Sequence, residues 1–157
     1  MDKKRQEAGC RMMISTKGRY ALRVMIDLAE HPSEGYITLQ TISGRLGISE
    51  KYLESILAVL SKAGLLDALR GKRGGYRLAR APEQYSTFEI LRLTEGTLAP
   101  VTCLEEGQSC EKADSCRTLP LWQGLDRAIE QYLSAYTLAD IVKMGCTPGE
   151  TGDAACV

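Results

Sequence analysis

Three of the six cysteines in this 157-residue chain lie close together, in the stretch CLEEGQSCEKADSC. Cys103, Cys110 and Cys116 follow a C-x6-C-x5-C spacing. Zinc sites usually pair their cysteines across about two to four residues, so this spacing fits zinc poorly. Thiolates also bind iron-sulfur clusters, and a cluster held by these three cysteines would need one further ligand. Thiols can, in addition, form regulatory disulfides. The spacing leaves these last two chemistries open.

The setting of the cysteines depends on compartment and charge. The sequence has neither an apolar run of about 18 residues nor an apolar segment behind its basic start, so we expect no membrane span and a cytoplasmic protein with free thiols. Residues 1–82 hold 15 Lys or Arg and 8 Asp or Glu, a net charge of +7, whereas residues 83–157 hold 5 and 12, a net charge of −7. A basic half predicts a polyanion such as nucleic acid as partner, although the two halves could simply attract each other.

The basic half has the periodicity of three helices. TKGRYALRVMIDLAEH, with Thr16 as expected cap, places apolar residues at i, i+3 and i+4, and His31-Pro32 ends it. We interpret His31, the only histidine, as a residue near the last carbonyls of this helix rather than as a ligand. TLQTISGRLG and SEKYLESILAVLSKAGLL follow, joined by a short turn that contains glycine. Two helices joined in this way are typical of a helix-turn-helix motif.

A basic hairpin follows the third helix. LDALRGKRGGYRLAR has two alternating arms around a loop of three glycines and three cations. A helix-turn-helix followed by such a hairpin indicates a winged helix that binds DNA. The predicted fold class is therefore mainly α with a small β-hairpin wing: a winged helix-turn-helix domain over residues 13–82, preceded by a disordered extension or misassigned start over residues 1–12.

The acidic half is predicted to be a connecting and dimerising region. STFEILRLTE forms a short helix with Ser86 as cap and Glu89 at capping-box spacing, and the cysteine loop completes residues 83–116. Residues 117–145 are expected to form a long and a short dimerisation helix, and residues 146–157 a disordered tail. An apolar stripe on the long helix predicts a homodimer, which would pair two recognition helices on a two-fold-symmetric operator. Its members are Leu121, Trp122, Leu125, Ala128, Ile129, Tyr132, Leu133 and Tyr136.

Four stretches resemble one known family. ISTKGRYALRVMIDLA (14–29), ISEKYLESIL (48–57), LRGKRGGYRLAR (69–80) and the three-cysteine loop before a long helix are similar to the Rrf2 family of winged-helix transcription regulators. The resemblance covers residues 13 to about 145 and is most specific in STKGRYAL and in the wing. It implies a homodimer with two winged helices and a long dimerisation helix that crosses its mate.

The resemblance also implies which residues face DNA. Glu54 would accept from a cytosine amino group, Arg70 would enter the minor groove, and Tyr52 is either a DNA contact or a packing residue. The complete expected set is Thr16, Lys17, Arg19, Ser49, Lys51, Tyr52, Glu54, Ser55, Arg70, Lys72, Arg73 and Gly74.

In cluster-binding members of the family, the matching loop holds an iron-sulfur cluster, so the resemblance assigns Cys103, Cys110 and Cys116 as ligands. We expect a two-iron, two-sulfur cluster rather than a four-iron, four-sulfur one. The chain departs from the family at the fourth ligand, because Leu119 stands where some members have histidine, and Arg19 where others donate an acidic residue from the partner. The candidates are Glu111, Asp114, an acidic residue from the partner, a small thiol or water. Cys10, Cys146 and Cys156 lie in the expected tails.

We therefore interpret the chain as a dimeric DNA-binding regulator, most simply a repressor, whose cluster senses iron-sulfur, redox or nitric oxide status. The alternative is a family member that a regulatory partner protein or thiol oxidation controls without a cluster. We do not expect an enzyme, because the sequence offers neither a phosphate-binding glycine loop between strand and helix nor a Cys/His pair in reach of each other.

Overall fold

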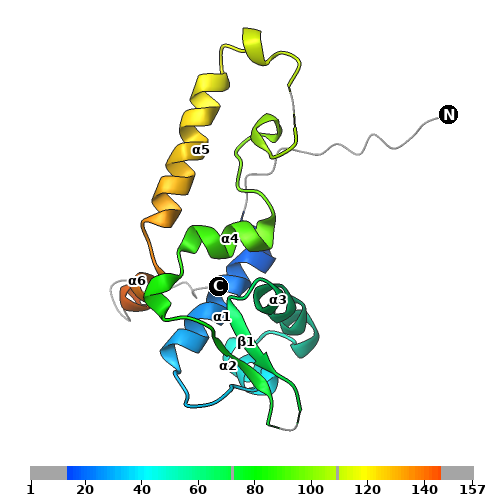
Figure 1. The fold of residues 1–157 in the computed structure, drawn as a ribbon, viewed down its shortest axis with the longest axis vertical. Helices are drawn as coiled ribbons and strands as arrows, with labels where there is room; N and C mark the ends of the chain where they lie inside the picture. Colours follow the sequence, from blue (N-terminus) through cyan, green and yellow to red (C-terminus); the bar gives the residue numbers. More distant parts are fainter. Residues whose placement is uncertain (1–13, 72, 109, 146–157) are drawn as a thin grey trace, which may run out of the picture.

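The computed structural model describes residues 14–71, 73–108 and 110–145. They form a winged-helix body from which one long helix and the cysteine loop project (Figure 1). The expected extension 1–12, the tail 146–157, Lys72 and the cysteines at 10, 146 and 156 lie outside the described residues.

The first helix, α1, spans Thr16–Glu30. Its cap is Ser15 and not Thr16 as predicted, because the Ser15 Oγ accepts from the Gly18 backbone N–H at 3.2 Å. A cap residue must stay extended, and Thr16 already has helical geometry. The helix ends at His31, whose Nδ1 lies 2.8 Å from the Asp27 carbonyl oxygen, which confirms the expected helix-end position.

The helix-turn-helix consists of α2, Leu39–Leu46, and α3, Glu50–Lys62. Thr38 caps α2 by accepting from the Thr41 N–H. Gly47 ends α2 with a φ of 66°, which favours glycine. Ser49 precedes α3, but its side chain makes no capping hydrogen bond.

The wing is the predicted hairpin. β1, Leu66–Leu69, pairs antiparallel with β2, Gly75–Leu78. A bridge that periodicity did not predict adds Ile37, from the α1–α2 connection, beside Tyr76. Gly75 allows this approach, since a Cβ there would lie 2.3 Å from the Ile37 carbonyl oxygen. The base of the wing is thereby attached to the segment that leads into α2.

The hydrophobic core lies between α1, α3, α4 and the base of the wing. α4 spans Thr87–Glu95 and follows a 3-10 turn, η1, at Pro82–Gln84. The fully buried Tyr85 donates from its hydroxyl to the Leu65 carbonyl and accepts from the Arg80 N–H, each at 2.8 Å. A buried hydroxyl with both partners adds packing area without the cost of an unpaired polar group.

Only one part of the capping box predicted for α4 is present. Ser86 caps it by accepting from the Glu89 N–H at 3.1 Å. The Glu89 carboxylate instead accepts from Arg80 Nη2 at 2.8 Å. Arg80, which follows β2, therefore binds the Glu89 carboxylate that the predicted capping box would use.

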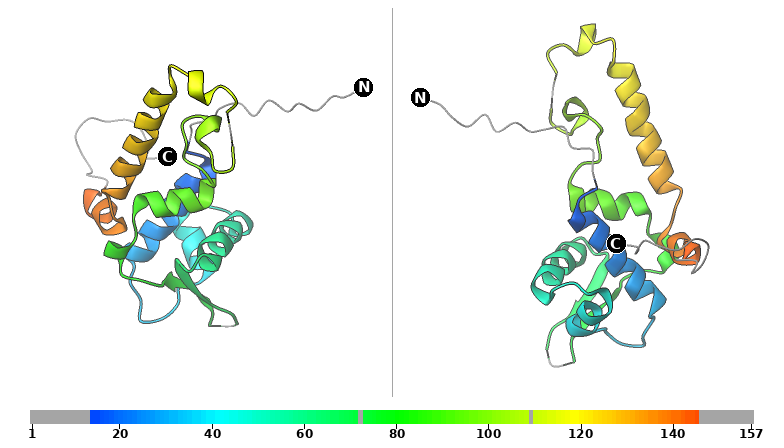
Figure 2. Two further views of the ribbon diagram at one scale, coloured as in Figure 1. Left: turned by 45° about the horizontal axis from the view of Figure 1, so that its top comes forward. Right: turned by 180° about the vertical axis from the view of Figure 1, so that it is seen from behind.

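The cysteine loop and two helices complete the chain. The loop contains two 3-10 turns, η2 at Thr102–Leu104 and η3 at Ala113–Ser115, and leads into α5, Leu119–Ser134. No residue of α5 is buried within the chain, and α5 projects from the body in each view (Figure 2). None of the helices in the described part of the chain has both the length and the apolar character that a membrane span requires.

The last helix, α6, spans Leu138–Met144 and returns to the body. Leu138 is fully buried in the core, and its N–H donates to the Tyr85 carbonyl at 2.9 Å. Thr87 donates from its N–H and its hydroxyl to the Tyr136 carbonyl. These contacts fix the C-terminal end of α5 to the winged helix.

A buried carboxylate joins α1 to α2. The Asp27 side chain is 5% exposed and accepts from Arg45 Nη2 at 2.8 Å. His31 Nδ1 lies 3.5 Å from the other carboxylate oxygen. Because a buried carboxylate is costly without a partner, Arg45 holds the first helix of the motif against α1.

Arg45→Ala is expected to lower the free energy of unfolding by about 1–3 kcal/mol, because it leaves the Asp27 carboxylate buried without its cation. Arg77→Ala is the control, since Arg77 pairs with the half-exposed Asp67 at 3.2 Å, and its loss should cost under about 1 kcal/mol. Urea denaturation followed by circular dichroism measures both. Equal losses would contradict this role of the Asp27–Arg45 pair.

Candidate DNA-binding surface and cysteine loop

The exposed side of α3 carries most of the expected recognition residues. Ser49, Lys51, Glu54 and Ser55 are all exposed at its N-terminal end. Leu53, Ile56 and the other apolar residues of the helix face the core. The Ser55 hydroxyl donates to the Tyr52 carbonyl at 2.6 Å, so its oxygen can still accept. This end of α3 therefore presents cationic, acceptor and hydroxyl groups to its surroundings.

Tyr52 differs from its neighbours on α3. It is half-buried and packs on the core. Its ring meets that of Tyr20 edge to face, with centroids 5.9 Å apart. Of the two roles considered for Tyr52, this geometry supplies the packing contact.

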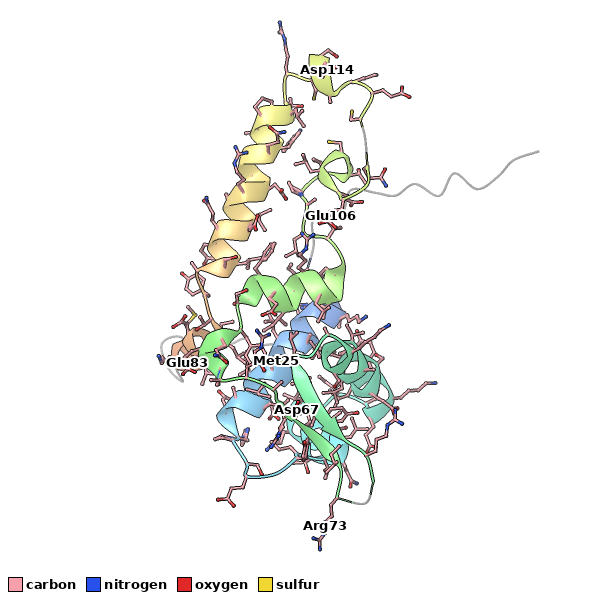
Figure 3. All side chains as sticks on the ribbon, in the orientation of Figure 1. Met25, Asp67, Arg73, Glu83, Glu106 and Asp114 are labelled. Atoms are coloured by element: carbon pink, nitrogen blue, oxygen red, sulfur yellow. The ribbon has the colours of Figure 1, made fainter. Side chains whose placement is uncertain are left out.

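The wing presents two exposed cations on a turn of glycines. Arg70 and Arg73 are exposed, and Arg73 lies at the tip (Figure 3). Gly71 has a φ of 109°. A Cβ at Gly74 would lie 2.2 Å from the Leu69 carbonyl oxygen, so the turn closes only without a side chain there. Gly74 is thus required for the turn that holds both arginines outward.

The start of α1 carries the remaining expected residues. Thr16 and Arg19 are exposed, and Arg19 Nη2 donates to the Thr16 Oγ1 at 3.2 Å. Lys17 between them is half-buried. The cations of this turn lie beside backbone N–H groups at the positive end of the helix dipole, an arrangement that suits phosphate contact.

The three loop cysteines are free, with Cys103 and Cys116 half-buried and Cys110 exposed. In donor chemistry they fit an iron-sulfur cluster, because thiolates are its ligands. However, the three thiols do not form a ready-made site: within the described ranges, no three Cys, His, Asp or Glu side chains lie close enough together to hold a metal ion. The candidate fourth ligands Glu111 and Asp114 are exposed, and Asp114 lies at the opposite end of the molecule from Arg73 (Figure 3).

Cys116 has a distinct environment. Its Sγ lies 3.4 Å from the Thr118 Oγ1. This hydrogen bond, helped by the Thr118 backbone, stabilises the thiolate and holds the pKa of Cys116 below its usual value. Cys116 therefore forms its thiolate more readily than an ordinary cysteine does.

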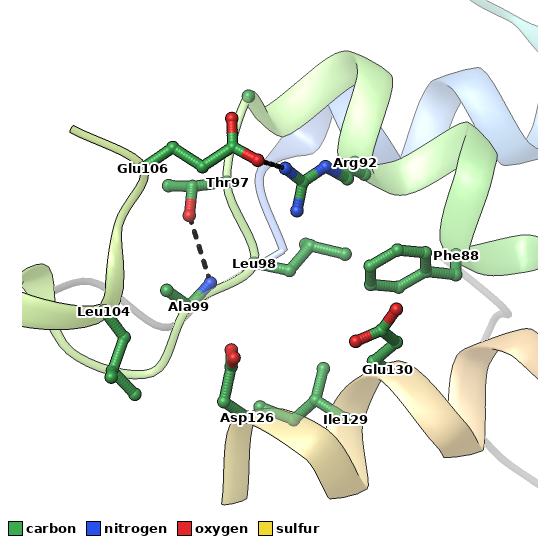
Figure 4. Close-up of a pocket in the computed structure, with 11 residues that line it drawn as sticks. Phe88, Arg92, Thr97, Leu98, Ala99, Leu104, Glu106, Asp126, Ile129 and Glu130 are labelled. Carbon is green, nitrogen blue, oxygen red and sulfur yellow. Dashed lines mark hydrogen bonds and ion pairs between the residues drawn. The ribbon is translucent and has the colours of Figure 1, made fainter. Parts of the chain in front are cut away.

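An ion pair attaches the cysteine loop to the body. Arg92 on α4 pairs with Glu106, which lies between Cys103 and Cys110. The pair borders a small pocket between α4, the loop and α5, and Asp126 and Glu130 line its other side (Figure 4). The loop thus contacts α4 directly.

Comparison with known proteins identifies the family. The profile of the Rrf2 family, described as an iron-dependent transcriptional regulator, matches residues 14–144. The chain belongs to the Rrf2 family. Within it, the chain is 37% identical over 139 residues to the regulator CymR of Bacillus subtilis, which covers 88% of this chain and 94% of that protein. It is 36% identical over 132 residues to the regulator IscR of Xenorhabdus nematophila, which covers 84% of this chain and 80% of that protein.

Solved structures of the Rrf2 family agree with the winged-helix fold. The structure of CymR, the global cysteine regulator of B. subtilis, matches with a TM-score of 0.68 and 37% identity over 85% of this chain and 98% of that one. That of T. potens IscR matches with a TM-score of 0.66 and 37% identity over 89% and 93%. The chain is therefore a transcriptional regulator, in a family of regulators rather than enzymes.

Sequence reasoning missed one local contact and two long-range contacts around the expected sites. Thr118 beside Cys116 could have been found from its spacing of two residues. The Arg92–Glu106 pair and a contact of Glu95 with Ser15 have no local signal, because their partners lie 14 and 80 residues away.

Thr118→Val is expected to raise the pKa of Cys116, because the thiolate loses its hydroxyl donor, and to slow alkylation of Cys116 below the thiol pKa. Site-resolved mass spectrometry after brief iodoacetamide treatment across a pH series measures this. Thr102→Val, beside Cys103 in the same loop, should leave the Cys116 profile unchanged. An unchanged midpoint in Thr118→Val would rule out the hydroxyl as the cause.

Proposed function

We propose that this Rrf2-family regulator binds duplex DNA as a homodimer, and that the state of its cysteine loop controls the binding. The observation that carries the DNA-binding surface is the exposed polar end of α3 beside a glycine-built basic wing, with α3 in contact with β1. Arg70 and Arg73 would meet the minor groove or the phosphates, and Glu54 a cytosine amino group. The start of α1, with Thr16, Lys17 and Arg19, would contact the DNA backbone.

The proposed homodimer rests on α5. Leu121 and Tyr132 on its apolar stripe are each 64% exposed, and no residue of the helix is buried by the chain itself. Packing α5 against its copy would cover this surface and pair two recognition helices for a two-fold-symmetric operator.

For regulation, we propose that Cys103, Cys110 and Cys116 hold an iron-sulfur cluster once the loop closes around it. Three free thiols on one segment, one with a lowered pKa, support this assignment. A bound cluster would supply a redox-active, labile centre whose state reports on the cell. Two irons rather than four, and repression rather than activation, stay predictions.

A CymR-like mechanism is the second candidate. CymR relatives are as similar to this chain as IscR relatives are, and the related structures include an oxidised form of Staphylococcus aureus CymR with a TM-score of 0.62. In this alternative, thiol oxidation or a partner protein controls DNA binding without a cluster.

Arg70→Ala is expected to weaken binding by about 1–3 kcal/mol, because an exposed wing cation is lost from the DNA contact. The probe is a duplex that the wild-type protein selects from a random-sequence pool, titrated by fluorescence anisotropy at fixed salt. Arg77→Ala is the matched control in the same hairpin, because Arg77 is engaged by Asp67 and stacks over Tyr36. Unchanged affinity in Arg70→Ala would refute the wing assignment.

The cluster assignment predicts that protein purified without oxygen is coloured and contains iron and sulfide. Serine at Cys103, Cys110 or Cys116 should remove the absorption, whereas Cys10→Ser, outside the loop, should not. Cluster-loaded and cluster-free protein should differ in affinity for the selected duplex, because a ligand controls binding only by preferring one state. A colourless protein whose affinity changes on thiol oxidation, or only with a partner, would favour the second candidate.

A further inference from the structure

A carboxylate from α4 lies against the first turn of α1. Oε1 of Glu95, the last residue of α4, accepts from the Ser15 N–H at 3.1 Å and from the Ser15 hydroxyl at 2.8 Å. The same hydroxyl caps α1 by accepting from the Gly18 N–H at 3.2 Å. One carboxylate oxygen therefore holds the residue that begins α1.

Gly18 makes room for this carboxylate. A Cβ at Gly18 would lie 2.1 Å from Glu95 Oε1. The backbone there is ordinary helix, where glycine costs about 1 kcal/mol relative to alanine. The close approach of Glu95, and not a turn, explains a glycine at this position.

Glu95 also supplies a charge that α1 lacks. The first turn of α1 contains no acidic residue of its own, although a negative charge at a helix N-terminus is stabilising. Thr16, Lys17 and Arg19 occupy that same turn. The contact therefore holds in place the segment assigned above to the DNA backbone.

We propose that Glu95 is a positioning residue for DNA binding: it holds the first turn of α1 so that Thr16 and Lys17 meet the phosphates. This inference rests on the proposed function of that turn. Two effects of Glu95 have opposite signs, which makes the inference testable. A negative charge near phosphates weakens binding by repulsion, whereas an anchor strengthens it by keeping the turn ordered.

Three variants separate the anchor from the charge. Glu95→Ala removes both. Gly18→Ala keeps the charge but displaces the carboxylate, and Glu95→Gln removes the charge but keeps an oxygen that can accept from Ser15. Glu89→Ala is the matched control, because Glu89 is a glutamate on the same helix whose carboxylate pairs with Arg80 rather than with Ser15.

Full-length variants are titrated with the selected duplex across a salt series. Glu95→Ala and Gly18→Ala should bind about three- to tenfold more weakly. For both variants the slope of log K against log salt should become less steep, by about the amount that one lost phosphate contact would cause. Glu95→Gln should bind as tightly as wild type or more tightly, and Glu89→Ala within about twofold of wild type.

Tighter binding by Glu95→Ala would show that Glu95 acts only through its charge, and would overturn the inference. Unchanged affinity and salt dependence in Gly18→Ala would overturn it as well. If Glu95→Ala does not fold, as judged by circular dichroism, Gly18→Ala still tests displacement of the Glu95 carboxylate, and Glu95→Gln still tests removal of its charge.

Lys17→Ala in the same assay separates this inference from the proposed function. If Lys17→Ala changes neither affinity nor salt dependence, the assignment of the α1 turn to the DNA backbone is wrong. If Lys17→Ala weakens binding while Gly18→Ala does not, the DNA contact stands and only the positioning role of Glu95 fails.

Discussion

Burial of one face of α1 is the packing interaction on which the other elements depend. Ala21, Val24 and Met25 on this face are fully buried, and α2, α3, α4, α6 and β2 all contact the helix. Complete burial of a side chain as large as valine or methionine contributes about 1.5–3 kcal/mol. The proposed recognition helix, α3, and α4, which leads into the cysteine loop, therefore both pack against α1.

Charge is separated along the molecule. The wing, with Arg73 at its tip, lies at one end, and the acidic cysteine loop, with Asp114, lies at the other (Figure 3). Because phosphates repel acidic surfaces, this division supports the proposal that the wing end of the molecule is the one that approaches DNA. The net charge of zero hides this division, because the two halves cancel.

The cysteine loop lies between two attachments to the body. On the α4 side, Arg92 pairs with Glu106 within the loop, and α4 ends at Glu95, whose carboxylate accepts from Ser15 at the start of α1. On the α5 side, the helix begins just after Cys116. The bridge between Ser86 and Thr137 attaches the chain just beyond the C-terminal end of α5 to the body. The segment that carries the thiols is thus joined to the DNA-binding body through both α4 and α5.

Local patterns in the sequence determined α1 to α3 and the wing with its cationic turn. Helix periodicity, caps and glycine turns depend on residues within a few positions of each other, so the sequence alone can reveal them. Local patterns also predicted the family and the three thiols. Only the tertiary structure decided which side chain serves which neighbour: Arg80 takes Glu89 from its cap, Tyr52 packs on Tyr20, and Glu95 anchors the start of α1. These contacts join segments from 9 to 80 residues apart, and no local pattern encodes them because they form only when the core brings those segments together.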